Sequence, residues 1–145
     1  MVSRRLAPAA GPVVLDTGAV LAYVAGDVIV RDLCRAAALA TQQVVFPTVV
    51  YAQVERGWNR RSTATYLLNY LLEICDIRPL SLEIAKQAGW LLRDSQTTDV
   101  VDAVVVAEVV ARGSATIVTS DRGDIDSLLG FTANRPRRGV RVVGV

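Results

Sequence analysis

Four apolar runs of this sequence each carry one acidic residue, either directly after the run or inside it. An apolar run is normally buried in a folded protein, and a buried carboxylate is costly unless it has a partner. Four acids carried to the edge of one core therefore imply a cation that neutralises them. These acids are Asp16 after residues 13–15, Glu55 after residues 49–54, Asp102 within residues 100–106, and Asp121 after residues 115–120.

The chain has 145 residues, a length typical of one domain that folds without disulfides or structural metals. Its two cysteines, Cys34 and Cys75, are expected to be buried free thiols of a protein in a reducing compartment. The sequence contains no histidine, which excludes histidine general bases, Ser-His-Asp triads and histidine-ligated zinc. Carboxylates acting with a hard divalent cation are the chemistry that remains.

Residues 1–12 are expected to form a flexible leader ahead of a single domain over residues 13–145. The basic stretch 3–6 is only faintly similar to an export signal, because prolines and an acid interrupt the apolar residues after it. The longest uncharged run, residues 36–54, contains two glutamines and Pro47 and is unsuited to crossing a membrane. We therefore expect a cytoplasmic protein without a membrane partner.

Short apolar runs alternate along the chain with segments of helical periodicity. This alternation predicts a three-layer α/β/α fold, with helices on both faces of a central, mainly parallel sheet of four to five strands. The seven valines of segment 100–111 favour a strand, but its length and regularly spaced alanines favour a buried helix, capped by Thr98 and ended by Gly113. The expected strands are residues 13–16, 44–46, 75–78, 115–119 and 140–145. The other expected helices are residues 17–25, 27–40, 48–55, 63–73, 81–93 and 121–129.

Ligands of open α/β sheets bind beyond the carboxyl ends of the strands. Asp16 and Asp121 lie at such ends, and Glu55 and Asp102 lie on helices that can lean over the same edge. Two carboxylates a few ångströms apart repel each other by roughly 4 kcal/mol at an effective dielectric constant of about 20. Because Mg²⁺ or Mn²⁺ reverses this repulsion, the pattern predicts a divalent-metal site suited to phosphodiester hydrolysis.

Each acid also has a structural interpretation. Asp16 and Asp121 could cap the helices that follow them, and Glu55 could pair with a neighbouring arginine on the surface. Asp102 is the hardest to explain in this way, because an acid inside a valine run rarely faces a core without a function. Two further acids are assigned by default to helix capping or to the outer shell of the site, Asp99 and Asp124.

Four segments resemble, in order and spacing, the acidic motifs of PIN domains. They are VVLDTGAVLA (13–22), PTVVYAQVERG (47–57), VVDAVVVA (100–107) and IVTSDRGDI (117–125). The resemblance extends over residues 13–145, and the small size is most similar to VapC-type toxins of bacterial toxin–antitoxin pairs. It implies a Mg²⁺- or Mn²⁺-dependent endoribonuclease that acts on RNA, forms a homodimer and is held inactive by a cognate VapB-like antitoxin.

The resemblance also implies roles for individual residues. Asp16 and Asp102 would be the principal metal ligands, although the third motif also offers Asp99. Asp102 is preferred, because an Asp-Ala pair followed by an apolar helix is more similar to the family. The catalytic acids that complete the site would be Glu55 and Asp121. The residues that line it by hydrogen bonding would be Thr17 and Ser120.

The basic residues of this chain are 15 arginines and Lys86. Arginine favours bidentate contacts with phosphate, although a GC-rich genome would produce the same bias. Trp58 could stack on an unpaired base or pack a helix end, and packing is preferred. Arginines next to the acidic motifs, which would hold an RNA backbone, are Arg56, Arg60, Arg61 and Arg122. Three more form a basic loop, Arg135, Arg137 and Arg138.

Two other functions are consistent with parts of the pattern. A non-catalytic RNA- or partner-binding module could keep the PIN fold, but nucleic-acid binding alone has no use for an acidic pocket. A phosphatase on a similar sheet could also use acids and a metal. Its phosphoaspartyl mechanism would need a second aspartate two residues after Asp16, where this chain has Gly18.

Overall fold

The computed structural model describes residues 11–132 and 139–145. Most of the expected leader, residues 1–12, lies outside this range. The three arginines of the expected basic loop also lie outside it, namely Arg135, Arg137 and Arg138.

Five strands form one sheet in the order β3-β2-β1-β4-β5, and every neighbouring pair is parallel. The strands are β1 (Val13–Leu15), β2 (Val44–Pro47), β3 (Asp76–Arg78), β4 (Ala115–Thr119) and β5 (Val140–Gly144). The three inner strands are fully buried, as expected of parallel strands covered on both faces. The predicted α/β class and strand number are therefore confirmed, with a sheet that is wholly parallel.

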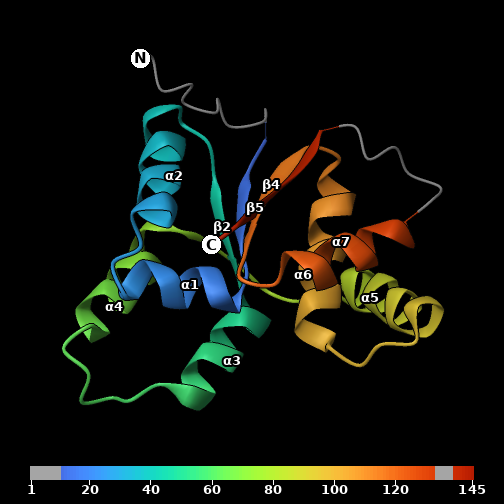
Figure 1. Ribbon diagram of the computed structural model, residues 1–145, viewed down its shortest axis with the longest axis horizontal. Coiled ribbons are helices and arrows are strands. Elements are labelled where there is room, and N and C mark those ends of the chain that lie inside the picture. The colour runs from blue at the N-terminus through green and yellow to red at the C-terminus, as the bar shows by residue number, and fades with distance from the viewer. Residues whose placement is uncertain (1–10, 133–138) are drawn as a thin grey trace.

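Helices cover both faces of this sheet (Figure 1). They are α1 (Thr17–Val24), α2 (Val28–Leu39), α3 (Thr48–Gly57), α4 (Thr65–Ile74), α5 (Leu82–Ser95), α6 (Val100–Arg112) and α7 (Arg122–Gly130). The chain moves outward from β1 to β3 and then crosses back to β4 and β5. Right-handed connections therefore place α1 to α4 on one face and α5 to α7 on the other, which agrees with the contacts within each group.

The valine-rich segment is helix α6, as the preferred interpretation predicted. Its residues 103–109 are all buried, because the helix packs against α5, α7 and the sheet. Gly113 ends the helix in a left-handed conformation with φ of 78°. The predicted N-cap is corrected, because the capping side chain is Asp99 rather than Thr98.

The two cysteines are buried and unpaired, as expected. Burial raises the pKa of Cys34 to about 11 and that of Cys75 to about 12, so both stay protonated at neutral pH. Among the described residues, no helix is both long and apolar enough to cross a membrane.

The carboxyl ends of β1 and β4 approach each other closely at Gly18. A Cβ atom on Gly18 would lie 1.8 Å from Oγ and 2.3 Å from Cβ of Ser120. The chain leaves β1 toward one face of the sheet and leaves β4 toward the other. The ends of these two strands therefore flank the switch point of the sheet, where α/β proteins bind ligands.

We predict that Gly18→Ala destabilises the protein by about 1–3 kcal/mol, because the added methyl group forces Ser120 and the two strand ends apart. Urea denaturation measures the change. The matched control is Gly89→Ala in the exposed part of α5, where nothing lies within 4 Å of the added atom. That variant should gain about 0.5–1 kcal/mol from helix propensity. Equal stability of the Gly18→Ala variant and the parent would contradict the close approach.

Candidate active site at the carboxyl end of the sheet

Asp16 is the most buried acid of the predicted site. It follows β1 directly, and only 3% of its surface is exposed. Its Oδ1 atom accepts a hydrogen bond of 2.8 Å from the backbone N–H of Ala19, so it caps helix α1. Burial raises the pKa of Asp16, while hydrogen bonds from the Thr119 side chain and the backbone of Ala19 and Ser120 partly offset the effect.

Asp121 lies at the end of β4, next to Asp16 in the sheet. It caps helix α7 by accepting a hydrogen bond of 3.2 Å from the backbone N–H of Asp124. The backbone N–H of Asp121 in turn donates to Oγ1 of Thr119 at 2.9 Å. Thr119 is fully buried and hydrogen-bonds both Asp16 and Asp121, so it couples the ends of β1 and β4.

Asp99 and Asp102 lie at the start of α6. Asp99 caps the helix by accepting a hydrogen bond of 2.9 Å from the backbone N–H of Asp102, which is in the first turn. Asp99 is exposed, whereas Asp102 is partly buried. Three of the helices that start at this edge of the sheet, α1, α6 and α7, thus have an aspartate as their N-cap.

The five aspartates act on one another electrostatically. The pKa of Asp102 is raised to about 7, first by burial and then by the charges of four acids, Asp99, Asp16, Asp121 and Asp124. The pKa of Asp124 is raised chiefly by Asp121. The structure therefore brings Asp16, Asp102 and Asp121 together, as the sequence predicted, and adds Asp99 and Asp124 to the group.

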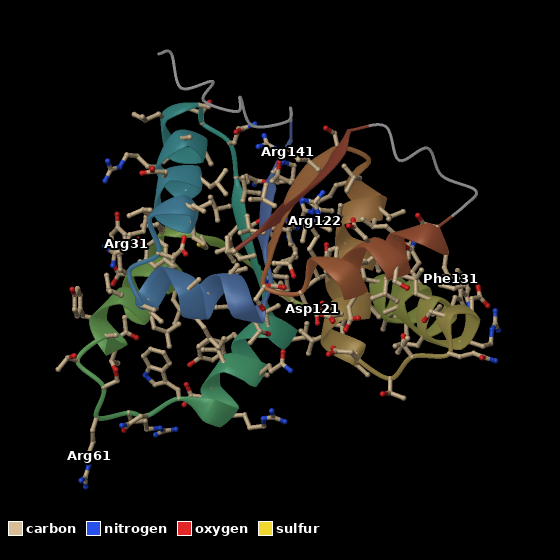
Figure 2. All side chains as sticks on the ribbon, in the orientation of Figure 1. Arg31, Arg61, Asp121, Arg122, Phe131 and Arg141 are labelled. Carbon is tan, nitrogen blue, oxygen red and sulfur yellow. The ribbon has the colours of Figure 1, made fainter. Side chains whose placement is uncertain are left out.

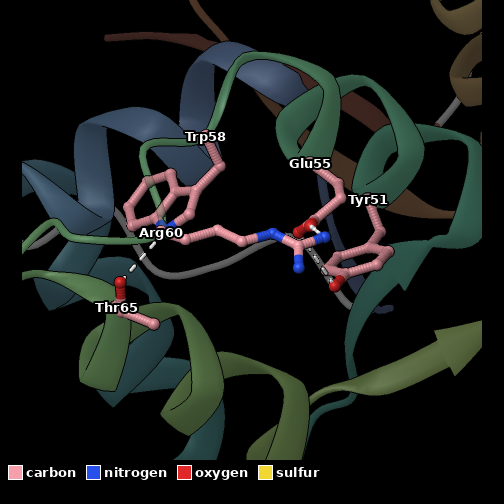
Figure 3. A network of polar contacts seen from close by, with 5 residues as sticks. All are labelled: Tyr51, Glu55, Trp58, Arg60 and Thr65. Carbon is pink, nitrogen blue, oxygen red and sulfur yellow. Dashed lines mark hydrogen bonds and ion pairs between the residues drawn. The ribbon is translucent and has the colours of Figure 1, made fainter.

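Glu55 is not one of the acids that raise the pKa of Asp102 or Asp16. Its carboxylate accepts a hydrogen bond from Tyr51 at 3.1 Å and pairs with Arg60 at 3.0 Å, as Figure 3 shows. Such a surface ion pair with a neighbouring arginine was the structural interpretation of Glu55 in the sequence analysis.

Gln53 of α3 forms a side-chain hydrogen bond to the segment that follows Asp16. Its Oε1 atom accepts a hydrogen bond from Oγ1 of Thr17, the first residue of α1. Thr17 was predicted to line the site, but Gln53 and Thr119 were not. Two features of the sequence could have pointed to them. Gln53 is a polar residue at a half-buried position of a helix, and Thr119 is a polar residue at the end of an apolar strand.

The arginines predicted to bind RNA do not surround the aspartates. Arg61 projects from the loop between α3 and α4, away from Asp121 (Figure 2). Arg122 packs against Gly144 and pairs with Asp126 at 3.4 Å. Of the other two predicted arginines, Arg56 is exposed on α3 and Arg60 forms an ion pair with Glu55.

Trp58 packs against the protein, which is the role preferred over base stacking in the sequence analysis. It is partly buried against the core, and its Nε1–H donates to Oγ1 of Thr65 at 3.1 Å (Figure 3).

The chemistry of this donor set fits a hard divalent cation. All five side chains are carboxylates, and those around Asp102 disfavour its ionised form, which a bound cation would favour. Among the described residues, no three acidic, cysteine or histidine side chains converge closely enough to hold one metal ion together. Mg²⁺ does not require three, because it is usually bound by one or two carboxylates and keeps several waters.

Comparison with known proteins agrees with the fold. Residues 13–127 match the PIN domain, and the chain therefore belongs to the PIN domain family. Its structure is similar to the crystal structure of VapBC2 from Rickettsia felis bound to a DNA fragment from their promoter. The TM-score is 0.67 at 14% sequence identity, over 91% of this chain and 98% of the matched chain. No protein of curated function has a matching sequence.

We predict that Asp102→Asn stabilises the metal-free protein by an amount that grows with pH. Folding raises the pKa of Asp102 from 3.8 to about 7, so ionised Asp102 opposes folding. The destabilisation is absent below about pH 4, grows as the pH rises and is complete above about pH 8. Because Asp102 is only partly buried, solvent screening limits this destabilisation to about 1–2 kcal/mol.

Urea denaturation in the presence of EDTA, at about pH 4 and at about pH 8, measures this difference. Asp32→Asn is the matched control, because Asp32 is an exposed acid on α2. The same gain for Asp102→Asn at both pH values would show that Asp102 ionises as an ordinary surface acid.

Proposed function

We propose that this protein is a divalent-metal-dependent endoribonuclease and the toxin of a type II toxin–antitoxin pair. The observation that carries the proposal is the group of five aspartates at the switch point of a PIN-family sheet. Burial, together with repulsion from the other four, raises the pKa of Asp102 to about 7, and a bound cation would relieve the repulsion. RNA binding alone would be weakened by these charges, which argues against a non-catalytic module.

Asp16 and Asp102 are the residues that would hold Mg²⁺ or Mn²⁺, with Asp121 completing the site. Asp16 is fixed by three hydrogen bonds, so one ligand is already oriented before a cation binds. The outer carboxylates, Asp99 and Asp124, would act through water. Glu55 is not part of this proposed set, because Tyr51 and Arg60 already bind its carboxylate.

When bound, the cation supplies a Lewis acid that polarises the phosphodiester and makes an adjacent water more acidic. The residues of this chain orient that chemistry. Asp16 is held rigidly by the first turn of α1 and by Thr119. Asp102, whose pKa of about 7 in the metal-free protein a bound cation would lower, would present an ionised carboxylate to that cation near neutral pH.

The partners follow from the same proposal. The similar structure is described as VapBC2 bound to a DNA fragment from their promoter, which supports a VapB-like antitoxin as the proposed inhibitor of this chain. We also propose that the protein acts in the cytoplasm as a homodimer. The exposed arginines of α3 and of the loop after it are the proposed contacts to the RNA backbone, namely Arg56, Arg60 and Arg61.

The proposal predicts Mn²⁺- or Mg²⁺-dependent cleavage of RNA that EDTA abolishes. Asp16→Asn and Asp102→Asn should each reduce the cleavage rate by about 100-fold or more, because each removes a carboxylate that would hold the cation. A fluorogenic RNA oligonucleotide measures the rate, and Asp32→Asn should retain it. If both site variants cut as fast as the parent, the aspartate group is not the active site.

We predict that Glu55→Gln lowers the KM for RNA by about threefold without a change in kcat. The substitution removes a negative charge and frees the Arg60 guanidinium to bind phosphate. Arg60→Gln should raise KM by a similar factor, and both effects should shrink at high salt. A loss of kcat in Glu55→Gln would instead place Glu55 in the catalytic group.

A further inference from the structure

Helix α3 presents different side chains on two opposite sides. Residues two positions apart on an α-helix are separated by about 200° around its axis. Gln53 contacts Thr17 at the start of α1, and Glu55 lies on the other side with Tyr51 and Arg60. One of the two residues can face the aspartate site, and the contacts show that it is Gln53.

The contact between Gln53 and Thr17 lies next to the buried metal-ligand candidate. Thr17 follows Asp16 in the chain and is the first residue of the helix that Asp16 caps. Its hydroxyl group donates to the Gln53 amide oxygen, so α3 is tied to the turn that orients Asp16. Helices α1 and α3 also pack directly against each other.

We propose that Gln53 is a positioning residue that fixes the first turn of α1 and keeps the α3 side of the cation site neutral. The proposal rests on the proposed function, because it concerns the same cation site. The amide oxygen supplies the acceptor for Thr17 without adding a charge beside Asp16 and the group of aspartates to which it belongs. A glutamate at this position would keep the acceptor and add a sixth carboxylate, so charge and position can be separated.

Two substitutions separate these effects. Gln53→Glu preserves the acceptor and adds charge, so it should bind Mn²⁺ about tenfold more tightly than the parent. Gln53→Leu removes the acceptor at similar volume, leaving the Thr17 hydroxyl unpaired, and should bind Mn²⁺ about threefold more weakly. The matched control is Ala52→Glu, which adds the same charge to the exposed side of α3 and should change the affinity less than twofold.

Isothermal titration calorimetry with Mn²⁺ measures the affinities, and thermal unfolding supplies a second readout. Without metal, Gln53→Glu should unfold at a lower temperature than the parent, because the added charge is repelled. Saturating Mn²⁺ should reverse this order, which a merely structural role of Gln53 would not do. Both readouts use the intact chain and need no RNA substrate.

The outcomes distinguish this inference from the proposed function. If the parent binds Mn²⁺ and cleaves RNA but Gln53→Glu binds Mn²⁺ no more tightly than Ala52→Glu, the role of Gln53 is overturned and the nuclease stands. Parent-like Mn²⁺ binding by Gln53→Leu would overturn the positioning role alone. A parent that binds no millimolar Mn²⁺ and cleaves no RNA overturns both proposals.

Discussion

Burial of the Asp16 carboxylate between β1 and β4 is the constraint on which the site depends. An ionised carboxylate in this position is unfavourable unless several donors replace its water. The first turn of α1, the Thr119 hydroxyl and the Ser120 backbone supply those donors. They can do so because Gly18 lets the two strand ends approach closely. Asp121 is brought beside Asp16 by the same approach, since Thr119 hydrogen-bonds both.

Helix capping and metal binding are compatible roles for these acids. A cap uses one carboxylate oxygen, and the second oxygen remains available to a cation. Three helices start at this edge with Asp16, Asp99 and Asp121 as caps. The positive ends of their dipoles lower the cost of gathering like charges. Helix capping and metal binding, which were treated as alternative roles in the sequence analysis, are therefore compatible in the same side chains.

The sequence predicted the fold well, because apolar strands and capped helices are local patterns. It also located three of the grouped aspartates, since they end a buried strand or interrupt a buried helix. It could not decide which face of α3 turns toward the site. Glu55 was predicted for the site as the charged residue of this segment, whereas the helical phase turns Gln53 toward Thr17 and Glu55 toward Arg60. The phase is decided by packing of Val50 and Val54, which a motif does not reveal.

Helix α6 carries two acids with a raised pKa, Asp102 and Glu108, and the comparison shows when such a shift is structural. Glu108 is buried and its pKa is also raised, but Arg112 and Arg78 act in the opposite direction, and Arg112 forms an ion pair with it. That arrangement is a structural charge network. For Asp102, the four charges named above as raising its pKa all belong to other aspartates. Two acids on one helix, both with a raised pKa, therefore differ in their partners. The acid that lacks a cationic side chain is the one at the sheet edge where a metal would bind.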